Sequence, residues 1–317
     1  LLLPEGQRIH EARSPIVLMK AIKNAAEIAS SRTAHQRAAA AKIRSLVRLE
    51  RLLAAGQPVS ELAYSEMLHE EYSSEEGFSD LSFTTIAAAG ANGAIVHYSQ
   101  ASPEVELRNG ELFLIDSGVQ VFGGTTDDTR TVSIGVPSER QRRLYTLVLR
   151  CHIRLAQQKF PEGTNGQVLD GMARSLIWNA GLDYGHGTGH GVGAFLNVHE
   201  GPQRLAPRGS EEPLQAGMII SNEPGYYENG WGGIRLENLY VVMPDDDMPP
   251  HPSGKRWLQL ESLTLIPFDK RLIDWDQLTE AEQVWLKRYH QHVWETIGPM
   301  LNEAERVWLQ EACTLPR

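Results

Sequence analysis

The longest regular pattern of apolar and polar positions runs from about Lys20 to Leu53. This segment is rich in Ala, Arg, Lys and Leu, contains no Gly or Pro, and is followed by Gly56 and Pro58. Those residue types favour a helix, whereas Gly and Pro end one. The pattern therefore predicts one long helix, and a second helix is expected from Glu61 to Tyr72.

Beyond Leu81 the pattern changes to short apolar runs separated by Gly, Asn and Thr, which is typical of strands and turns. Two β-hairpins are expected, the first with the adjacent glycines 123 and 124 in its connection and the second with a Gly-rich link. The paired runs are residues 111–116 with 127–134, and residues 218–220 with 234–242.

Helical spacing returns between and after the hairpins. One helix is expected to begin at Ser138, which forms a capping-box pattern with Gln141, and another to cover residues 166–180. A final helix is expected to begin at Thr279, which has Glu282 three positions later, and to end at residues 298–299. The tail is also rich in tryptophan, and we expect these rings to pack on the main body or on a second subunit rather than to bind a ligand: Trp275, Trp285, Trp294 and Trp308.

Composition excludes several classes of function. The net charge of −10 leaves no basic excess for a nucleic-acid partner, and no apolar run is as long as a transmembrane helix, so neither nucleic acid nor membrane is an expected partner. Cys151 and Cys313 are the two cysteines, which argues against a thiolate zinc site or a disulfide framework and fits the cytoplasm.

Several catalytic motifs are absent. The sequence contains no GxSxG, no HExxH and no P-loop. Residues 189–194 match a loose dinucleotide fingerprint, but residues 195–202 have a poor helix pattern, and a phosphate-binding turn should open a helix. A dinucleotide site is therefore rejected.

What remains is a set of acids at the ends of the predicted strands. Asp116 closes one apolar run and Asp127 begins the next, eleven residues on, so a hairpin can bring both carboxylates close enough to share a cation. Glu223 and Glu237 belong to the second hairpin, and an ionised Glu on a buried strand requires a partner or a metal.

Taken singly, each acid has an ordinary explanation, such as capping a turn or pairing with Arg235. Together, the four carboxylates predict an oxygen-rich site that suits manganese, cobalt or zinc. Two such ions can hold a bridging hydroxide that attacks an amide carbonyl.

Histidines complete the candidate site. His97, His186, His190 and His199 lie in the same central region of the chain. His186 and His190 stand in a stretch too rich in glycine for a stable helix, and glycine permits the close backbone approach that a metal or substrate site needs. The other histidines have the ordinary reading of core or surface residues.

The run of motifs resembles the pita-bread metallopeptidases and, within them, the X-prolyl aminopeptidases (aminopeptidase P) of the cytosolic type. Each motif alone is weak, but all of them occur in the family's order. The matching segments are Ala94–Tyr98, Leu114–Gly118, Thr125–Asp127, His186–Gly193, Val198–Pro202, Glu223–Tyr227 and Ile234–Asn238.

The resemblance implies an α+β, pseudo-symmetric pita-bread (creatinase/aminopeptidase) fold with a C-terminal helical extension. It implies that two divalent metal ions, Mn²⁺ first with Co²⁺ or Zn²⁺ as alternatives, are held by Asp116, Asp127, His190, Glu223 and Glu237. By the same resemblance, Glu223 is also the general base, and Arg235 orients the site from behind the ligands. His97, His186 and His199 surround the scissile bond.

The activity implied is removal of the first residue from peptides with proline at the second position. The expected parts are a linker-like segment (residues 1–13), a catalytic domain (14–262) and a C-terminal extension packed on it (263–317), and the resemblance also implies a homodimer. Asp128 departs from the family's pattern, which usually has an apolar residue there. Alternate residues of a strand face opposite sides, so Asp128 is expected to have no metal role.

Three alternatives stay open. A prolidase acting on Xaa-Pro dipeptides or a methionine-specific aminopeptidase would keep the chemistry and change the substrate, although residues 186–199 favour aminopeptidase P over both. A weakly active or non-catalytic scaffold is the alternative of another class. It is disfavoured because such relatives generally lose metal ligands, and none of the five is missing here.

Overall fold

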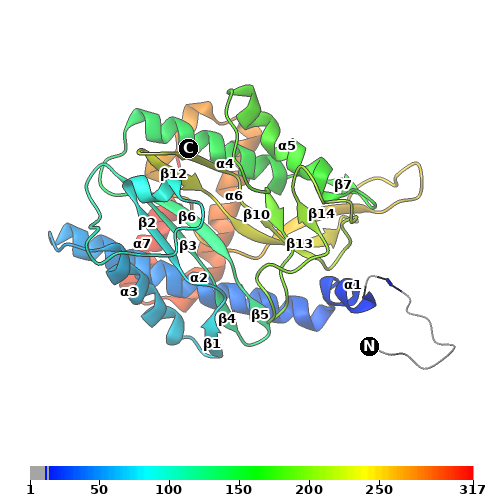
Figure 1. Cartoon of the computed structure of the whole chain (residues 1–317), viewed down its shortest axis with the longest axis horizontal. Coiled ribbons are helices and arrows are strands. Elements are labelled where there is room, and N and C mark those ends of the chain that lie inside the picture. Colours follow the sequence, from blue (N-terminus) through cyan, green and yellow to red (C-terminus); the bar gives the residue numbers. More distant parts are fainter. Residues whose placement is uncertain (1–10, 13, 317) are drawn as a thin grey trace.

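The structure, a computed structural model, describes residues 11–12 and 14–316. Strands from both halves of the chain lie between two groups of helices, α4 and α5 on one side and α2 and α3 on the other (Figure 1). Within the expected linker-like segment 1–13, residues 1–10 and 13 lie outside the described residues. No helix in the described part combines the length and apolarity needed to cross a membrane.

The described chain begins and ends with helices, and two runs of strands lie between them, separated by α4, β7 and α5. The α-helices are α1 (Pro15–Ala21), α2 (Ala25–Ala54), α3 (Glu61–Ser73), α4 (Glu139–Ala156), α5 (Gly166–Asn179), α6 (Glu280–Ile297) and α7 (Glu303–Cys313), and the 3₁₀ helices are η1 (Gly90–Ala94), η2 (Lys270–Leu272), η3 (Trp275–Gln277) and η4 (Gly298–Met300). The strands are β1 (Phe78–Leu81), β2 (Ile86–Ala89), β3 (Leu112–Ser117), β4 (Val119–Val121), β5 (Gly124–Thr125), β6 (Asp128–Ser133), β7 (Phe160–Pro161), β8 (Gly189–His190), β9 (Arg204–Leu205), β10 (Ile219–Asn222), β11 (Gly225–Glu228), β12 (Gly232–Arg235), β13 (Asn238–Pro244) and β14 (Trp257–Ser262).

The prediction of a single helix from Lys20 to Leu53 is wrong at its start, because the helix is interrupted between α1 and α2. Lys23 N–H donates to the Gly217 carbonyl at 2.9 Å. Asn24 then caps α2: its side chain accepts from the N–H groups of Ala26 and Glu27, and Glu27 accepts from Asn24 N–H in return. This capping box satisfies backbone donors that the first turn of a helix leaves free. The signal was present in the sequence as Asn24 followed three residues later by Glu27.

The other helix starts are as predicted. Ser138 with Gln141 and Thr279 with Glu282 both form capping boxes, at the starts of α4 and α6. The helix that begins at Thr279 is not the last one, however, because α7 follows it and is itself capped by Asn302 with Glu305.

The first predicted hairpin is confirmed. β3 pairs with β6 in antiparallel register, Asp116 opposite Thr129 and Ser117 opposite Asp128, and β2 completes a sheet in the order β2-β3-β6. Asp127 lies one residue before β6. The connection is more than a flexible glycine link, since it contains β4 and β5, which pair with each other, and β4 also pairs with β1.

The second predicted hairpin is only partly correct. β10 pairs with β13 in a sheet of order β10-β13-β14-β7, but a separate hairpin, β11 with β12, is inserted between them. The apolar run 234–242 is therefore divided between β12 and β13. Glu237 lies in the gap between these strands rather than inside one.

The C-terminal region shares a hydrophobic core with the central helices. Ile43 and Val47 of α2 and Leu149 of α4 belong to the same buried cluster as Phe268 and Leu286. The four tryptophans of the tail are partly buried against this cluster, as expected for packing on the main body. The division of the chain at residue 262 stays a prediction.

Candidate metal centre

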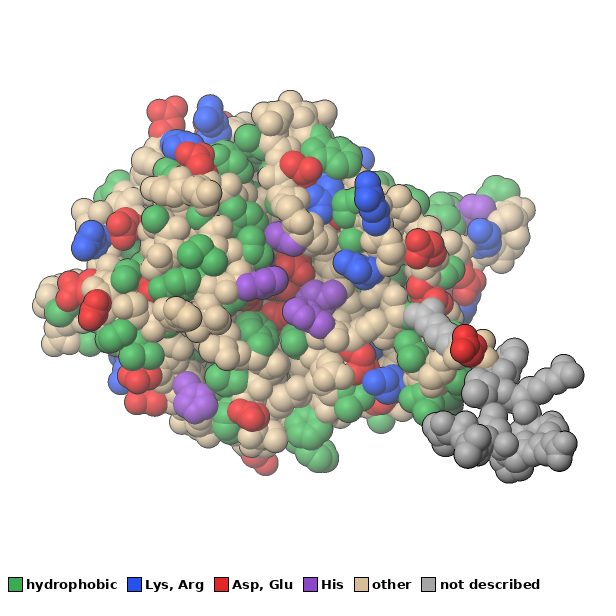
Figure 2. Space-filling view, viewed as in Figure 1, with side chains coloured by type: hydrophobic (Ala, Val, Ile, Leu, Met, Phe, Trp, Pro, Cys, Tyr) green, Lys and Arg blue, Asp and Glu red, His purple; other side chains and the backbone are tan. Residues whose placement is uncertain are grey.

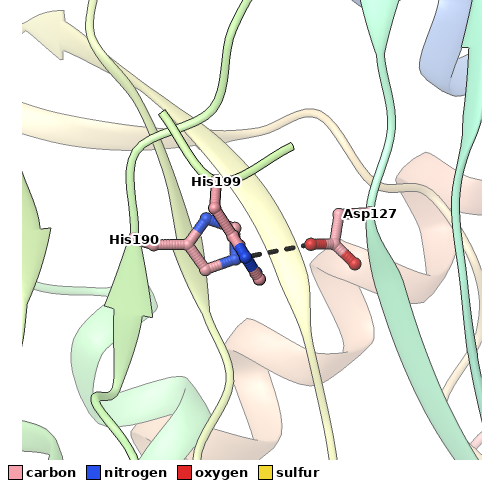
Figure 3. A group of neighbouring side chains, drawn as sticks. All are labelled: Asp127, His190 and His199. Carbon is pink, nitrogen blue, oxygen red and sulfur yellow. Dashed lines mark ion pairs between the residues drawn. The ribbon is translucent and has the colours of Figure 1, made fainter. Parts of the chain in front are cut away.

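Six acidic and histidine side chains from distant parts of the chain meet at one place. Three overlapping groups have ligand atoms within 4.8 Å of one another: Asp127 with His190 and His199, His190 with Glu223 and Glu237, and Asp116 with Asp127 and Glu237. In Figure 3, Asp127 reaches toward the rings of His190 and His199 from the opposite side of the site. His190 Nε2 lies 3.4 Å from Asp127 Oδ2 and 3.6 Å from Glu223 Oε1.

Local structure explains how each carboxylate reaches the site. The β3–β6 register places Asp116 and Asp127 at the same end of one hairpin. Glu223 directly follows β10, and its N–H donates to the Thr188 carbonyl at 2.8 Å, which joins it to the histidine segment. Glu237 N–H donates to the Thr129 carbonyl at 3.0 Å, so β6 holds it although it lies outside the strands.

Glycines let the histidine segment approach β10 closely, as the sequence predicted. A Cβ atom at Gly189 would lie 2.0 Å from the Ser221 carbonyl oxygen, and one at Gly191 would lie 2.1 Å from that of Glu200. Such distances leave no room for any side chain. His190 can therefore stand beside the carboxylates only because both its neighbours are glycine.

The carboxylates have unused acceptor atoms. Asp116 Oδ1 and Glu237 Oε1 are buried and accept no hydrogen bond from any described residue. Two of the other oxygens accept hydrogen bonds: Thr129 Oγ1 donates to Glu237 Oε2 at 2.7 Å, and Ser221 Oγ donates to Glu223 Oε1 at 3.1 Å. Buried carboxylate oxygens without a donor are costly, and divalent cations satisfy them. The donor set, four carboxylates and an imidazole, fits hard or borderline divalent ions.

The pKa values of the clustered carboxylates also indicate a cation site. Burial raises the pKa of Asp127 well above its ordinary value, and the charges of Asp116 and Glu223 raise it further. Burial likewise raises the pKa of Glu237, with Asp127 as the next cause. Carboxylates this close repel one another when ionised, and a bound cation removes that repulsion.

Arg235 forms an ion pair with one acid of this cluster, Asp116. Its Nη2 donates to Asp116 Oδ2 at 2.6 Å, its Nε donates to Thr129 Oγ1 at 3.1 Å, and its Nη1 donates to the Tyr227 hydroxyl at 2.9 Å. Arg235 thus fixes one oxygen of Asp116 and leaves the other free. One guanidinium does not balance four carboxylates.

The remaining histidines surround a cavity of about 710 Å³ that contains the acid cluster, with His97, His186 and His199 in its wall. Figure 2 shows histidine side chains around a hollow with acidic side chains at its base. His186 contacts the Gly187 carbonyl through Nδ1 at 2.8 Å and the Tyr227 hydroxyl through Nε2 at 2.9 Å. Burial lowers the pKa of both His186 and His199, which favours neutral rings that can donate or accept a hydrogen bond.

Tyr227 is the residue that sequence reasoning missed. It joins His186 to Arg235, and burial raises the pKa of its hydroxyl to about 12, so it stays a neutral hydrogen-bonding group. Its position four residues after Glu223, in the Glu-Pro-Gly-Tyr-Tyr motif, was the available signal. Nothing in that motif told which tyrosine faces the site.

With this geometry described, comparison with known proteins identifies the family. The sequence pattern of metallopeptidase family M24 matches residues 20–244, and that of the C-terminal region of M24 peptidases matches residues 256–315. The chain belongs to metallopeptidase family M24. The predicted family is thereby confirmed.

Relatives within M24 have consistent names. A probable Xaa-Pro aminopeptidase P of Coprinopsis cinerea is 44% identical over 317 residues, covering 98% of this chain and 51% of that protein. Aminopeptidase P2 of Arabidopsis thaliana is 48% identical over 303 residues, covering 94% of this chain and 42% of that protein. The chain thus spans about half the length of these relatives.

Solved structures confirm the expected α+β pita-bread fold. An X-prolyl aminopeptidase from Caenorhabditis elegans, described as a cytosolic enzyme with a di-nuclear active site, has a TM-score of 0.90 and 37% identity, covering 95% of this chain and 49% of that one. A Xaa-Pro dipeptidase from Bacillus anthracis has a TM-score of 0.65 and 30% identity, covering 80% of this chain and 64% of that one.

Proposed function

We propose that this chain carries the catalytic centre of an X-prolyl aminopeptidase, which releases the first residue from peptides whose second residue is proline. In this proposal Asp116, Asp127, His190, Glu223 and Glu237 hold two divalent cations. The observation that carries it is the set of overlapping ligand groups, together with the buried carboxylate oxygens that lack donors. The names and di-nuclear description of the M24 relatives support it.

The side chains divide the work of amide hydrolysis. Two bound cations would activate a water molecule and polarise the scissile carbonyl. Glu223, with Oε1 already accepting from Ser221, has its other oxygen available to take a proton from that water and to pass it to the departing proline nitrogen. His97 and His199 stand in the cavity wall, where an imidazole N–H can donate to the oxyanion that develops at the carbonyl. His186 lines the same cavity, but both of its ring nitrogens already contact the Gly187 carbonyl and the Tyr227 hydroxyl.

Arg235 and Tyr227 act by holding other groups. Arg235 keeps Asp116 in place, and Tyr227 holds the ring of His186 through its Nε2. These contacts reduce the freedom of the groups that would contact the substrate, and such orientation contributes to rate.

The decisive experiment measures both metal content and cleavage. Metal-free protein is loaded with Mn²⁺, Co²⁺ or Zn²⁺, elemental analysis counts the ions, and chromatography follows release of the first residue from Xaa-Pro-Xaa peptides. Two ions per chain and release of that residue are expected, with Mn²⁺ as the most effective ion. Folded protein that binds two ions and cleaves no peptide at any metal load would refute the activity.

The dipeptide Xaa-Pro serves as the comparison substrate. Preference for Xaa-Pro over Xaa-Pro-Xaa would replace the proposal with a prolidase, and preference for Met-Ala peptides would replace it with a methionine aminopeptidase. The higher TM-score of the X-prolyl aminopeptidase relative to the Xaa-Pro dipeptidase favours the longer substrate. A cytoplasmic location, supported by the cytosolic relative, and a homodimer are further parts of the proposal.

A further inference from the structure

Arg130 is a fully buried arginine that the catalytic scheme does not use. It lies in β6, is 1% exposed, and its guanidinium stands 4.4 Å from the centre of the Phe268 ring. Every N–H group of this guanidinium has an acceptor. Nε donates to Pro267 O (3.2 Å), Nη1 to Thr129 O (2.9 Å) and Glu237 O (2.7 Å), and Nη2 to Asn238 Oδ1 (2.7 Å), Ile266 O (2.7 Å) and the Tyr289 hydroxyl (2.9 Å).

One of these acceptors belongs to a candidate metal ligand. Glu237 lies in the gap between β12 and β13, so no ladder partner is available for its carbonyl. A buried carbonyl needs a donor, and Arg130 supplies it. Thr129, the neighbour of Arg130, supplies the rest: its carbonyl accepts from Glu237 N–H and its hydroxyl donates to Glu237 Oε2. Backbone and side chain of Glu237 are therefore both held by β6.

Three of the other acceptors come from the C-terminal region. Ile266, Pro267 and Tyr289 all fall within the segment matched by the C-terminal region of M24 peptidases. The Tyr289 hydroxyl also donates to Ile266 O at 2.8 Å and accepts from Ile266 N–H at 3.2 Å, so it fixes the loop that holds the guanidinium. Arg130 thus links this loop to the backbone of Glu237 in one hydrogen-bonded group.

We infer that Arg130 and Tyr289 are positioning residues for the metal centre, and that the C-terminal region acts through them to hold Glu237 in its ligating geometry. A guanidinium is planar and its N–H groups point in fixed directions. Hydrogen bonds to the loop at 266–267 fix the orientation of this plane, and the same guanidinium also donates to Glu237 and Asn238. Moving the loop would turn the guanidinium and release the Glu237 carbonyl. This inference rests on the proposed metal pair but not on the substrate.

The test measures metal binding rather than turnover. Titration of Mn²⁺ against a chelating indicator gives the two affinities, and electron paramagnetic resonance reports the magnetic coupling of a Mn²⁺ pair. Arg130→Gln is expected to weaken the second Mn²⁺ by about 10–100-fold, the usual effect of losing a group that holds a ligand. Tyr289→Phe, which removes one hydroxyl, is expected to give a smaller loss in the same direction and to weaken the coupling signal.

Leu309→Ala is the matched control, because Leu309 is buried in the same core on α7 and has no polar contact with this group. It should lower the melting temperature and leave both Mn²⁺ affinities unchanged. If Arg130→Gln does not fold, Tyr289→Phe and Arg130→Lys decide. Folded variants with wild-type affinities and coupling, or losses no larger than those of Leu309→Ala, would overturn the inference. Wild-type protein that binds none of Mn²⁺, Co²⁺ and Zn²⁺ would overturn both proposals, whereas a bound pair without cleavage would refute the activity alone.

Discussion

Buried charge is arranged in opposite ways on the two faces of the chain where strand β6 begins. On one face, Asp127 and its neighbours crowd four carboxylates together, and two of their buried oxygens accept no hydrogen bond from a described residue. On the other face, Asp128 forms an ion pair with Lys42, and the side chains of this pair are 3% and 0% exposed. Lys42 Nζ also donates to the Asp128 carbonyl at 3.0 Å. The two aspartates are adjacent in sequence and equally buried.

The difference teaches that burial of charge alone does not mark a functional site. A buried ion pair with all its donors and acceptors satisfied is a structural solution, and an apolar pair can often replace it. A buried group of like charges with free oxygens is stable only when something else binds there. Unbalanced charge, rather than burial, distinguishes the candidate metal centre from the layer behind it.

The largest expected effect is on kcat, from a substitution in the cluster of four carboxylates. Glu223→Gln keeps the size of the side chain but removes its ability to take a proton, so kcat on Xaa-Pro-Xaa peptides should fall by about 10²–10⁴-fold. Circular dichroism should show an unchanged fold. The control is Glu228→Gln, because Glu228, at the end of β11, forms a surface ion pair with Arg140 and its loss should leave kcat close to the wild-type value. Normal turnover by Glu223→Gln would show that Glu223 is not the base.

The next largest effect is expected on the free energy of unfolding, from the buried ion pair between Lys42 and Asp128. Lys42→Met leaves Asp128 buried without a partner and should lower the free energy of unfolding by about 3–5 kcal/mol. The double variant Lys42→Met/Asp128→Val replaces the pair with apolar groups and should recover most of that loss. Urea denaturation followed by linear extrapolation measures both values. A double variant as unstable as the single one would mean that packing, rather than unpaired charge, causes the loss.

The smallest expected effect is a change in the pH dependence of stability, which His290 causes in one direction and the acids of the metal centre in the other. Burial lowers the pKa of His290 to about 3, with the charge of Arg130 as a second cause, whereas an unfolded histidine has a pKa near 6.5. Below pH 6.5 the histidine of the unfolded chain binds a proton, whereas the buried His290 of the folded chain stays neutral. The stability present above pH 6.5 is therefore lost as the pH falls toward 3. For this one group the loss between pH 7 and pH 5 should be about 2 kcal/mol.

His290→Gln keeps an acceptor for the Phe268 N–H and does not titrate. On metal-free protein, the free energy of unfolding of this variant should therefore fall less steeply between pH 7 and pH 5 than that of the wild type. The acids of the metal centre act in the opposite sense: their raised pKa means that stability is lost as pH rises through the folded value. Parallel pH profiles for the two proteins would contradict the assignment to His290.

Much of the architecture was predictable because its signals are local. Capping boxes at Ser138 and Thr279 marked the starts of α4 and α6, and the spacing of Asp116 and Asp127 predicted their hairpin. The division of the run 234–242 was missed because β12 and β13 are both buried, although the adjacent polar residues Glu237 and Asn238 interrupt the apolar pattern there. The start of α2 at Asn24 had a signal, but the helix-forming residues on both sides of it concealed the break.

The sequence by itself determined the helices, whose caps and propensities act within a few residues, and the set of side chains with metal-binding chemistry. Only the tertiary structure decided which of these charges find partners. Thr129 meets Glu237 across 108 residues and Arg130 meets Tyr289 across 159. Asp127 and Asp128 differ because successive residues of a strand face opposite sides, and only folding places Lys42 on one side and three more carboxylates on the other.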